Sequence, residues 1–522
     1  MCNDTTEATM RAISTKPHQA SASDQDIVLA AKGGGIAFVG NLFVYVIRFA
    51  FGIVMARLLG AELLGLYSLS LTIVSVVGIL SSLGLSAGMS RYIPIAISKK
   101  DEARLWGTIQ VGVALPFITS LALAIGMFAL ARPLCYQVFE RPDMVPVLRL
   151  ACLVIPLLSL MSVLEGIVQG FKRMEYIVYE TVSLNLSKLV LSALLIWVGL
   201  SVMGAMIGHI VTYAMALTML FYFVHRLFPL TRPLHTAKRN IGEILRFTLP
   251  LYLSRVLRRF SGSIETLVLG FIGVMSGVGI YTTVMSLSSI GKMFHTALQK
   301  ITVPMISDLH SRGKLDQLAR VYQTTTKWGM MFNLPIFLVI AIFAGPLLTI
   351  FGSDFVTGAT SLIILAFATL FNASTGVCGS VITMTGHSKL TFVNSIVYLI
   401  INIALDLFFI PRWGIVGAAM AVTLSSVAIN ILRVIQVFAL LRLWPYNHSF
   451  LKPIIAAIVA AGVTHLANQW LVLVPALLQV TIGTLLLGGL YVLMIVLLKL
   501  SVEDRLVLGR LLNRFNIKWT RI

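Results

Sequence analysis

The chain has 522 residues, of which 58% are hydrophobic and 11% charged, and its formal net charge is +20. Soluble domains average about 45–50% apolar and about 25% charged residues, so a single soluble core cannot bury this much apolar surface. A basic chain can indicate nucleic-acid binding, but here the charges follow a membrane-topology pattern, and we expect no nucleic-acid partner.

Apolar runs recur from Gly33 to Leu498. Each is long enough to cross about 30 Å of hydrocarbon at about 1.5 Å per residue. They predict an all-α, polytopic membrane protein with about fourteen transmembrane helices. The predicted spans are 33–58, 63–90, 105–131, 147–170, 176–200, 203–225, 247–273, 277–299, 322–350, 358–385, 390–410, 414–441, 453–472 and 476–498.

The connections between these spans alternate in charge. The two terminal segments and every second connection contain 27 of the 40 Lys and Arg residues. The opposite connections, counted together with the adjoining ends of their spans, contain five, namely Arg57, Arg132, Arg141, Arg149 and Arg412. Basic loop residues mark the cytoplasmic side of a membrane protein. We therefore expect both termini in the cytoplasm. Residues 1–26 are polar, lack the apolar run of a signal peptide and predict a disordered cytoplasmic tail.

Two halves of the chain match at a nearly constant offset. Gly65-Leu66-Tyr67 matches Gly279-Ile280-Tyr281, and Gly204-Ala205 matches Gly417-Ala418. Parallel repeats of six helices are typical of transporters with a substrate path between the halves. We predict two pseudo-symmetric six-helix lobes plus two further helices. The predicted units are lobe 27–225, a cytoplasmic linker at 226–246, lobe 247–445, helices thirteen and fourteen at 446–498, and a basic cytoplasmic tail at 499–522.

The sequence gives little basis for catalysis. The predicted connections are short, the nine histidines are scattered, and the four cysteines lack metal or redox spacing. Neither a catalytic triad nor a phosphate-binding glycine loop stands out. We therefore expect a protein that is not an enzyme, with no catalytic residue, metal or cofactor.

Charged residues inside the spans are the strongest functional signal. Arg255, Arg258 and Arg259 are spaced to share one helical face, and each would cost about 2.5–3.5 kcal/mol at the centre of a lipid-facing helix. They should therefore face protein or water. Arg48 begins an Arg-Phe pair that recurs at Arg259 in the second half. Guanidinium groups bind phosphate through a bidentate fork, so these four arginines predict a phosphate or pyrophosphate site.

Other intramembrane charges have weaker interpretations. Lys188 and Lys292 are candidate lining residues of the same site. Glu265 and Asp406 are candidates for proton or sodium coupling, and salt bridges to nearby cations are an alternative for both. Four further charges are expected to pair internally or to reach the membrane interface, namely Glu165, Glu180, Lys327 and Arg433.

The chain resembles the oligosaccharide flippases of the multidrug/oligosaccharidyl-lipid/polysaccharide exporter superfamily. The resemblance covers about residues 27–515, and Glu265 departs from the Asp that is more common in the family. It is carried by ARLLGAELLGLYSLSL at 56–71, SLGLSAGMSRYIP at 82–94, MTGHSKL at 384–390 and NIALDLFFIPRWGIVGAAMAV at 402–422.

This resemblance implies a V-shaped pair of lobes that opens alternately to either side. The implied cargo is a polyprenyl-phosphate-linked or pyrophosphate-linked oligosaccharide, moved from the inner to the outer leaflet for surface polysaccharide biosynthesis. In related lipid II flippases, arginines of the central cavity are implicated in transport, and Arg48 and the face made by Arg255, Arg258 and Arg259 occupy comparable places. Membrane lipids and polysaccharide polymerase or assembly proteins are the expected partners.

Two other functions stay open at this point. A cation-coupled drug antiporter of the same superfamily would need carboxylates in its cavity and would gain little from arginines. A non-transporting scaffold of a polysaccharide assembly complex would need no cavity at all.

Overall fold

The structure is a computed structural model that describes residues 22–229, 241–471 and 473–498. Most of the predicted N-terminal tail and linker, and the whole predicted C-terminal tail, lie outside these residues. Nine helices in the described ranges are long and apolar enough to cross a membrane. The expected all-α membrane fold is confirmed, whereas the count of fourteen spans stays a prediction because several of these nine helices contain breaks.

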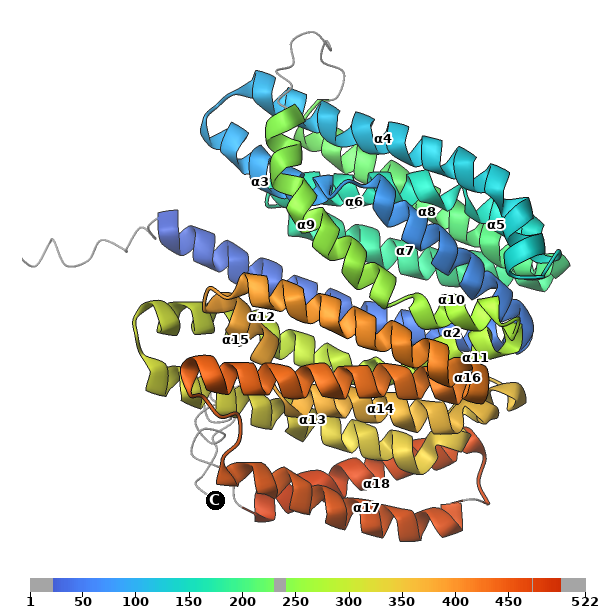
Figure 1. The fold of residues 1–522 in the computed structure, drawn as a ribbon, viewed down its shortest axis with the longest axis vertical. Coiled ribbons are helices and arrows are strands. Elements are labelled where there is room, and N and C mark those ends of the chain that lie inside the picture. The colour runs from blue at the N-terminus through green and yellow to red at the C-terminus, as the bar shows by residue number, and fades with distance from the viewer. Residues whose placement is uncertain (1–21, 230–240, 472, 499–522) are drawn as a thin grey trace, which may run out of the picture.

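The first part of the chain forms α2 to α8 (Figure 1). A π-helical turn at Leu134–Val138 extends α4, and another at Ile196–Leu200 separates α7 from α8. The helices are α2 (Ala22–Ser81), α3 (Leu85–Ser98), α4 (Glu102–Pro133), α5 (Met144–Ala151), α6 (Val154–Gly170), α7 (Met174–Leu195) and α8 (Ser201–Leu227).

The second part of the chain forms α9 to α18. Short 3₁₀ helices at Ser353–Gly358 and His448–Phe450 precede α14 and α17. The helices are α9 (Ile241–Ser261), α10 (Ile264–Phe271), α11 (Met275–Ser288), α12 (Ile290–Ser311), α13 (Leu315–Thr349), α14 (Ala359–Ser374), α15 (Cys378–Met384), α16 (Ser388–Leu441), α17 (Leu451–Leu471) and α18 (Ala476–Leu497).

Two of the longest helical elements each consist of two helices joined at a glycine. Gly60 in α2 has a φ of 71° and Gly414 in α16 has a φ of 52°. Backbone with positive φ favours glycine because it has no Cβ. Figure 1 shows the chain reversing direction in both elements at the same end of the molecule, on the right of the view. Gly60 lies between the predicted spans 33–58 and 63–90, and Gly414 is the first residue of the predicted span 414–441.

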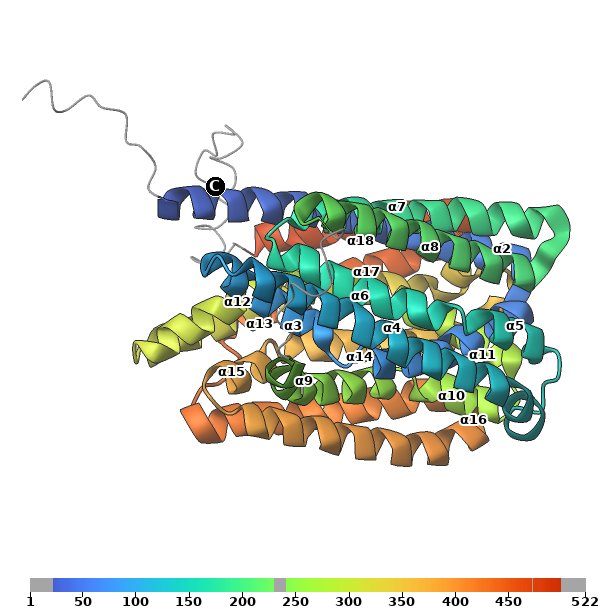
Figure 2. The same cartoon turned by 90° about the horizontal axis from the view of Figure 1, so that it is seen from above.

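The helices form two bundles whose axes run in one common direction (Figures 1 and 2). We call α3 to α8 the first bundle and α10 to α16 the second bundle. Helix α2 contacts both, because it packs against α7 and against α11. Helices α17 and α18 pack on the outer side of the second bundle, where Tyr491 donates a hydrogen bond of 2.9 Å to the Met331 carbonyl of α13.

The two halves of the chain approach each other most closely where α2 crosses α11. A Cβ atom at Gly65 would overlap the carbonyl oxygen of Met275, and one at Gly279 would overlap the carbonyl oxygen of Ala61. The hydroxyl of Thr282 lies one turn away and donates to Ser68 Oγ at 3.4 Å. Gly65 and Gly279 are matching positions of the sequence repeat, so equivalent backbone segments of the two halves touch here.

Helix α9 contacts both bundles, whereas α10 belongs to the second bundle. Glu243 near the start of α9 forms a 2.8 Å salt bridge with Arg104 of α4, and Tyr252 donates to the Leu80 carbonyl at 3.0 Å. Helix α10 instead contacts α16 in the second bundle. The lobe boundary at 247 therefore stays a prediction, since α9 also makes contacts with the first bundle.

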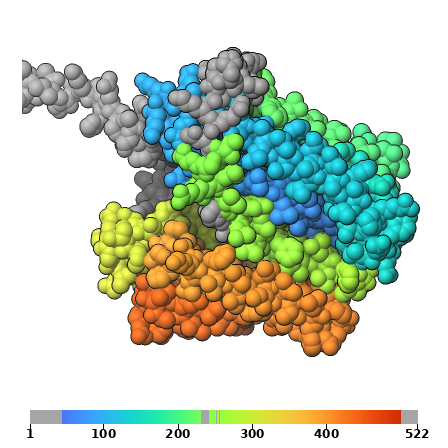
Figure 3. All heavy atoms as spheres, turned by 45° about the horizontal axis from the view of Figure 1, so that its top comes forward, coloured from blue at the N-terminus to red at the C-terminus, as the bar shows by residue number. Residues whose placement is uncertain are grey.

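The space-filling view shows a hollow between the two bundles (Figure 3). It opens at the end where the tip of α12 projects, which is opposite the α2–α11 crossing. The two bundles thus contact each other at one end and separate at the other, and a separation of this kind leaves polar side chains on the inner helices exposed.

Candidate functional site

Arg48 lies on the first half of α2 and has an exposed side chain. Its Nε donates to Asn185 Oδ1 of α7 at 3.0 Å. The Asn185 amide is itself fixed, because its Nδ2 donates to the Thr181 carbonyl at 2.6 Å. This chain of bonds orients the guanidinium through Nε, and the outer fork of a guanidinium is the part that binds an oxyanion in a bidentate manner.

Arg259 lies near the end of α9, and its side chain is also exposed. Its Nη2 donates to Ser75 Oγ of α2 at 2.8 Å. Arg259 therefore connects the end of α9 with the second half of α2. The predicted partners Arg255 and Arg258 belong to the same helix, but their side chains lie outside the described residues. Their place in the site stays a prediction.

Lys188 lies in the same region as Arg48. It follows Asn185 by three residues on α7, and its Nζ lies 4.5 Å from the centroid of the Phe51 ring of α2. A ring face stabilises an ammonium group without neutralising it. We call Arg48, Lys188 and Arg259 the cationic cluster, because Tyr213 of α8 interacts electrostatically with both arginines and Lys188 interacts with Arg48.

The cationic cluster has acidic neighbours that do not pair with it. Glu165 and Glu180 also interact with Tyr213, but within the described part of the chain neither forms a salt bridge to Arg48, Lys188 or Arg259. The Glu180 carboxylate instead accepts a 3.1 Å hydrogen bond from Thr181. A group of cations within the membrane-spanning part of a protein is costly unless an anion compensates it, so the cluster is suited to an anionic ligand.

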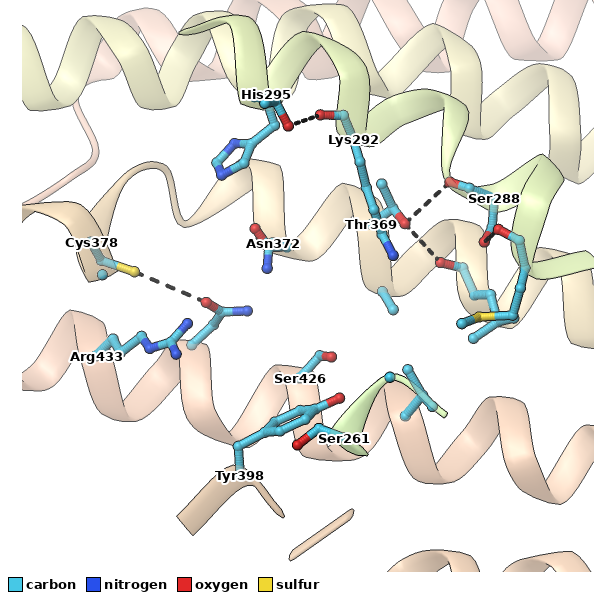
Figure 4. A pocket seen from close by; sticks show the side chains of 18 of the residues that line it. Ser261, Ser288, Lys292, His295, Thr369, Asn372, Cys378, Tyr398, Ser426 and Arg433 are labelled. Carbon is cyan, nitrogen blue, oxygen red and sulfur yellow. Dashed lines mark hydrogen bonds between the residues drawn. The ribbon is translucent and has the colours of Figure 1, made fainter. Parts of the chain in front are cut away.

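Lys292 belongs to a different place from the cationic cluster. It lines a cavity of about 400 Å³ inside the second bundle, between α10, α12, α14, α15 and α16. Figure 4 shows Lys292, His295 and Arg433 directing their side chains toward this space. We call it the second-bundle cavity. Lys292 is predicted from the sequence to line the same site as the arginines, whereas it lies beside these residues of the second bundle.

The predicted coupling residues Glu265 and Asp406 are both buried, with 2% and 0% of their surface exposed. Asp406 Oδ2 accepts a 3.0 Å hydrogen bond from Asn402 Nδ2, one helical turn earlier on α16. Asp406 Oδ1 and Asn402 Oδ1 are buried acceptors without a hydrogen-bond partner in the described structure. Glu265 interacts electrostatically with Asp406 and lines the second-bundle cavity.

Several residues of these sites were missed by the sequence analysis. Asn185 and Ser75 are polar residues in apolar spans, a weak signal because Asn and Ser also bond to their own helix. Asn402 could have been found from the sequence, because it precedes Asp406 by four residues and therefore shares its helical face. Arg433 was expected to pair or to reach the membrane interface, but it lines the second-bundle cavity.

The sequence matches two family models. One, described as polysaccharide biosynthesis protein, matches residues 30–310, and one described as MatE matches residues 250–408. Among curated relatives, the probable low-salt glycan biosynthesis flippase Agl15 of Haloferax volcanii is 24% identical over 76% of this chain and 81% of its own length.

The fold is similar to solved transporter structures. The lipid II flippase MurJ in an inward closed conformation aligns with a TM-score of 0.71 over 88% of this chain and 98% of that chain, at 14% identity. A multidrug-resistance transporter in an inward-facing conformation aligns with a TM-score of 0.63 over 76% of this chain and 94% of that chain, at 18% identity. At these identities, the structural similarity establishes the fold.

Proposed function

The chain belongs to the polysaccharide biosynthesis protein family, and from this premise we propose that it is a flippase for a polyprenyl-(pyro)phosphate-linked oligosaccharide. It moves this lipid from the inner to the outer leaflet of a prokaryotic plasma membrane for surface polysaccharide biosynthesis. The observation that carries the proposal is the cationic cluster of Arg48, Lys188 and Arg259, which has no acidic partner among the described residues.

The cargo explains why such a cluster is useful. Sugar hydroxyls and phosphate groups lose their hydration in hydrocarbon, where unsatisfied polar groups are costly. Guanidinium groups replace water as partners of the phosphate, and the lipid tail stays in the bilayer. Arg258, the neighbour of Arg259 in sequence, and Arg255, about one turn earlier, are proposed to extend the cluster along α9.

The opening between the bundles suggests how the cargo moves. We place the end with the basic connections and both termini in the cytoplasm, so the hollow faces the cytoplasm and the Gly65–Gly279 contact closes the outer side. Rocking of the lobes, approximately 27–225 and 247–445, would separate this contact and expose the head group outward. An inside-negative potential assists an outward-moving anion by about 2.3 kcal/mol per charge per 100 mV.

Glu265 and Asp406 are proposed to couple this movement to a proton or sodium ion. A cation bound between the two carboxylates would satisfy the orphaned Asp406 Oδ1 and Asn402 Oδ1. Carboxylate and amide oxygens are hard ligands suited to such an ion. A proton on Asp406 Oδ1 would instead turn this oxygen from an acceptor into a donor. Lys292, which interacts with Glu265, would tune this site from the cavity side.

The proposal is tested with purified protein in proteoliposomes. A polyprenyl-pyrophosphate-linked oligosaccharide is added to one leaflet, and its arrival in the other is followed with a membrane-impermeant sugar-modifying enzyme. Translocation above the rate of empty liposomes is expected. A protein that instead confers resistance to organic cations and leaves the lipid in place would be a drug antiporter, and one that restores polysaccharide assembly in cells without moving the lipid would be a scaffold.

A further inference from the structure

The second-bundle cavity contains more hydrogen-bond donors than the structure satisfies. Asn430 of α16 is buried, with 2% of its surface exposed, and its Oδ1 accepts from Cys378 Sγ at 4.0 Å. Its Nδ2 is buried without a hydrogen-bond partner in the part of the chain that the structure describes. A buried donor left without a partner costs about 1–3 kcal/mol, so this amide is arranged for a ligand.

Arg433 presents a second donor in the same place. It follows Asn430 by three residues and therefore lies on the same face of α16. Its Nε is buried and likewise has no hydrogen-bond partner within the described ranges. Among the described residues it forms no salt bridge, although internal pairing is one of the two roles that the sequence predicted for it. An amide and a guanidinium that lack partners at one wall favour an oxyanion.

The remaining lining is polar rather than purely cationic. Asn372, Ser426 and Tyr398 face the cavity along with Lys292 and His295 (Figure 4). Ligand sites typically have volumes of about 300–1,000 Å³, and this cavity measures about 400 Å³. It is large enough for a small polar molecule, and its hydroxyl and amide groups are suited to hydroxyl-bearing ligands.

Charge decides which hydroxyl-bearing ligand fits best. Glu265 is the carboxylate that lines the cavity, and Lys292 is its electrostatic neighbour. This leaves Arg433 as a cation whose charge is not compensated within the described cavity lining. A neutral sugar would leave that charge without a counterion, whereas a carboxylate on the sugar would neutralise it and accept from Asn430 as well.

We propose that the second-bundle cavity binds a carboxylate-bearing sugar of the cargo, with Arg433 and Asn430 as the donors to the carboxylate. The inference rests on the proposed function, because it assigns the glycan end of the same lipid-linked substrate to the second bundle. The phosphate end remains with the cationic cluster. Cargo selection then depends on an acidic sugar as well as on the lipid phosphate.

The test uses the full chain in lipid nanodiscs and ligand-observed saturation-transfer NMR with three probes: glucuronate, glucose and inorganic phosphate. Glucuronate is expected to give the strongest signal. Arg433→Gln is expected to weaken glucuronate binding about tenfold or more, because hydrogen bonds to charged groups are stronger than those between neutral groups. Arg433→Lys, which keeps the charge but loses the fork, should weaken it less. Arg442→Gln, one residue past the end of α16 and outside the cavity lining, should leave the signal unchanged.

The outcomes separate this inference from the proposed function. Equal signals from glucose and glucuronate, phosphate displacing glucuronate in an Arg433-dependent manner, or full binding by a folded Arg433→Gln protein would each overturn the acidic-sugar site. Arg259→Gln should retain glucuronate binding while losing lipid translocation. If glucuronate binds as expected but the wild-type protein moves no lipid-linked oligosaccharide, the cavity assignment stands and the flippase proposal fails.

Discussion

The two bundles share a backbone plan and differ in the charges that they hold. Where α2 crosses α11, Gly65 meets Gly279 and Ser68 meets Thr282, and both pairs are 214 residues apart. On the inner faces the match ends. The first bundle and its neighbours present the cationic cluster, whereas the second bundle buries Glu265 and Asp406. The repeat therefore preserves the contacts that shape the molecule, while the side chains that meet ligands have diverged.

The difference suggests a division of work. In the proposed function, cations beside the first bundle hold the phosphate, and carboxylates in the second bundle respond to a coupling ion. The phosphate role can be removed by substitutions in α2 and α9, and the coupling role by a substitution in the second bundle. If the division is correct, the two sets of variants should fail in different ways.

The largest effect is expected from the double substitution Arg48→Gln and Arg259→Gln. Each arginine supplies charge-assisted hydrogen bonds, which contribute about 1.5–3 kcal/mol apiece, so translocation of the lipid-linked oligosaccharide should fall at least about 100-fold. The proteoliposome assay measures the rate, and expression and melting temperature control for folding. Transport at the wild-type rate would show that these arginines do not hold the phosphate of the cargo.

A smaller and different effect is expected from Asp406→Asn. The variant keeps the shape of the side chain and its contact with Asn402 but loses the charge, so transport should fall about tenfold and should no longer respond to an imposed sodium or proton gradient. Phosphate binding should be unchanged, because the cationic cluster is intact. A variant that still responds to both gradients would exclude Asp406 from coupling.

The glycine crossing gives the next effect. Gly65→Ala would place a methyl group against the Met275 carbonyl, and overpacking of this kind costs about 1–3 kcal/mol. The cost applies to the closed arrangement, so the outer side should open more often. A cysteine introduced at Ser68 should then react faster with an impermeant thiol reagent added outside. Gly489→Ala on α18, where an added Cβ would meet open space, is the matched control.

Much of this architecture could be predicted from the sequence. The lengths of the apolar runs required helices that span a membrane, and the repeated Gly-x-Tyr segments identified positions that meet in the structure. The charges in the sequence could not show that the cations belong to two separate sites, the cationic cluster and the second-bundle cavity. Lys292 and Arg259 are both intramembrane cations, and only the packing of α12 and α9 puts them in different surroundings. The roles of Asn185 and Asn430 depend on their surroundings in the fold. Asn185 accepts from Arg48, which is distant in sequence, and Asn430 Nδ2 has no hydrogen-bond partner among the described residues.

The smallest effect is expected at the connection between α4 and α5, far from both sites. Arg141 forms 2.8 Å salt bridges with Asp143 and with Glu62 of α2, and its hydrogen bond lowers the pKa of Asp143 below the ordinary value. A carboxylate with a lowered pKa stabilises the fold above its unfolded pKa, about 3.9 for Asp, and loses this contribution as the pH falls further. Because the carboxylates are largely exposed, Arg141→Gln should cost only about 0.2–1 kcal/mol at neutral pH.

The difference in melting temperature between wild type and variant should shrink below about pH 4 and in high salt, where exposed pairs are screened. A difference that stays constant across pH and salt would mean that Arg141 acts through packing, and transport should be unaffected in either case.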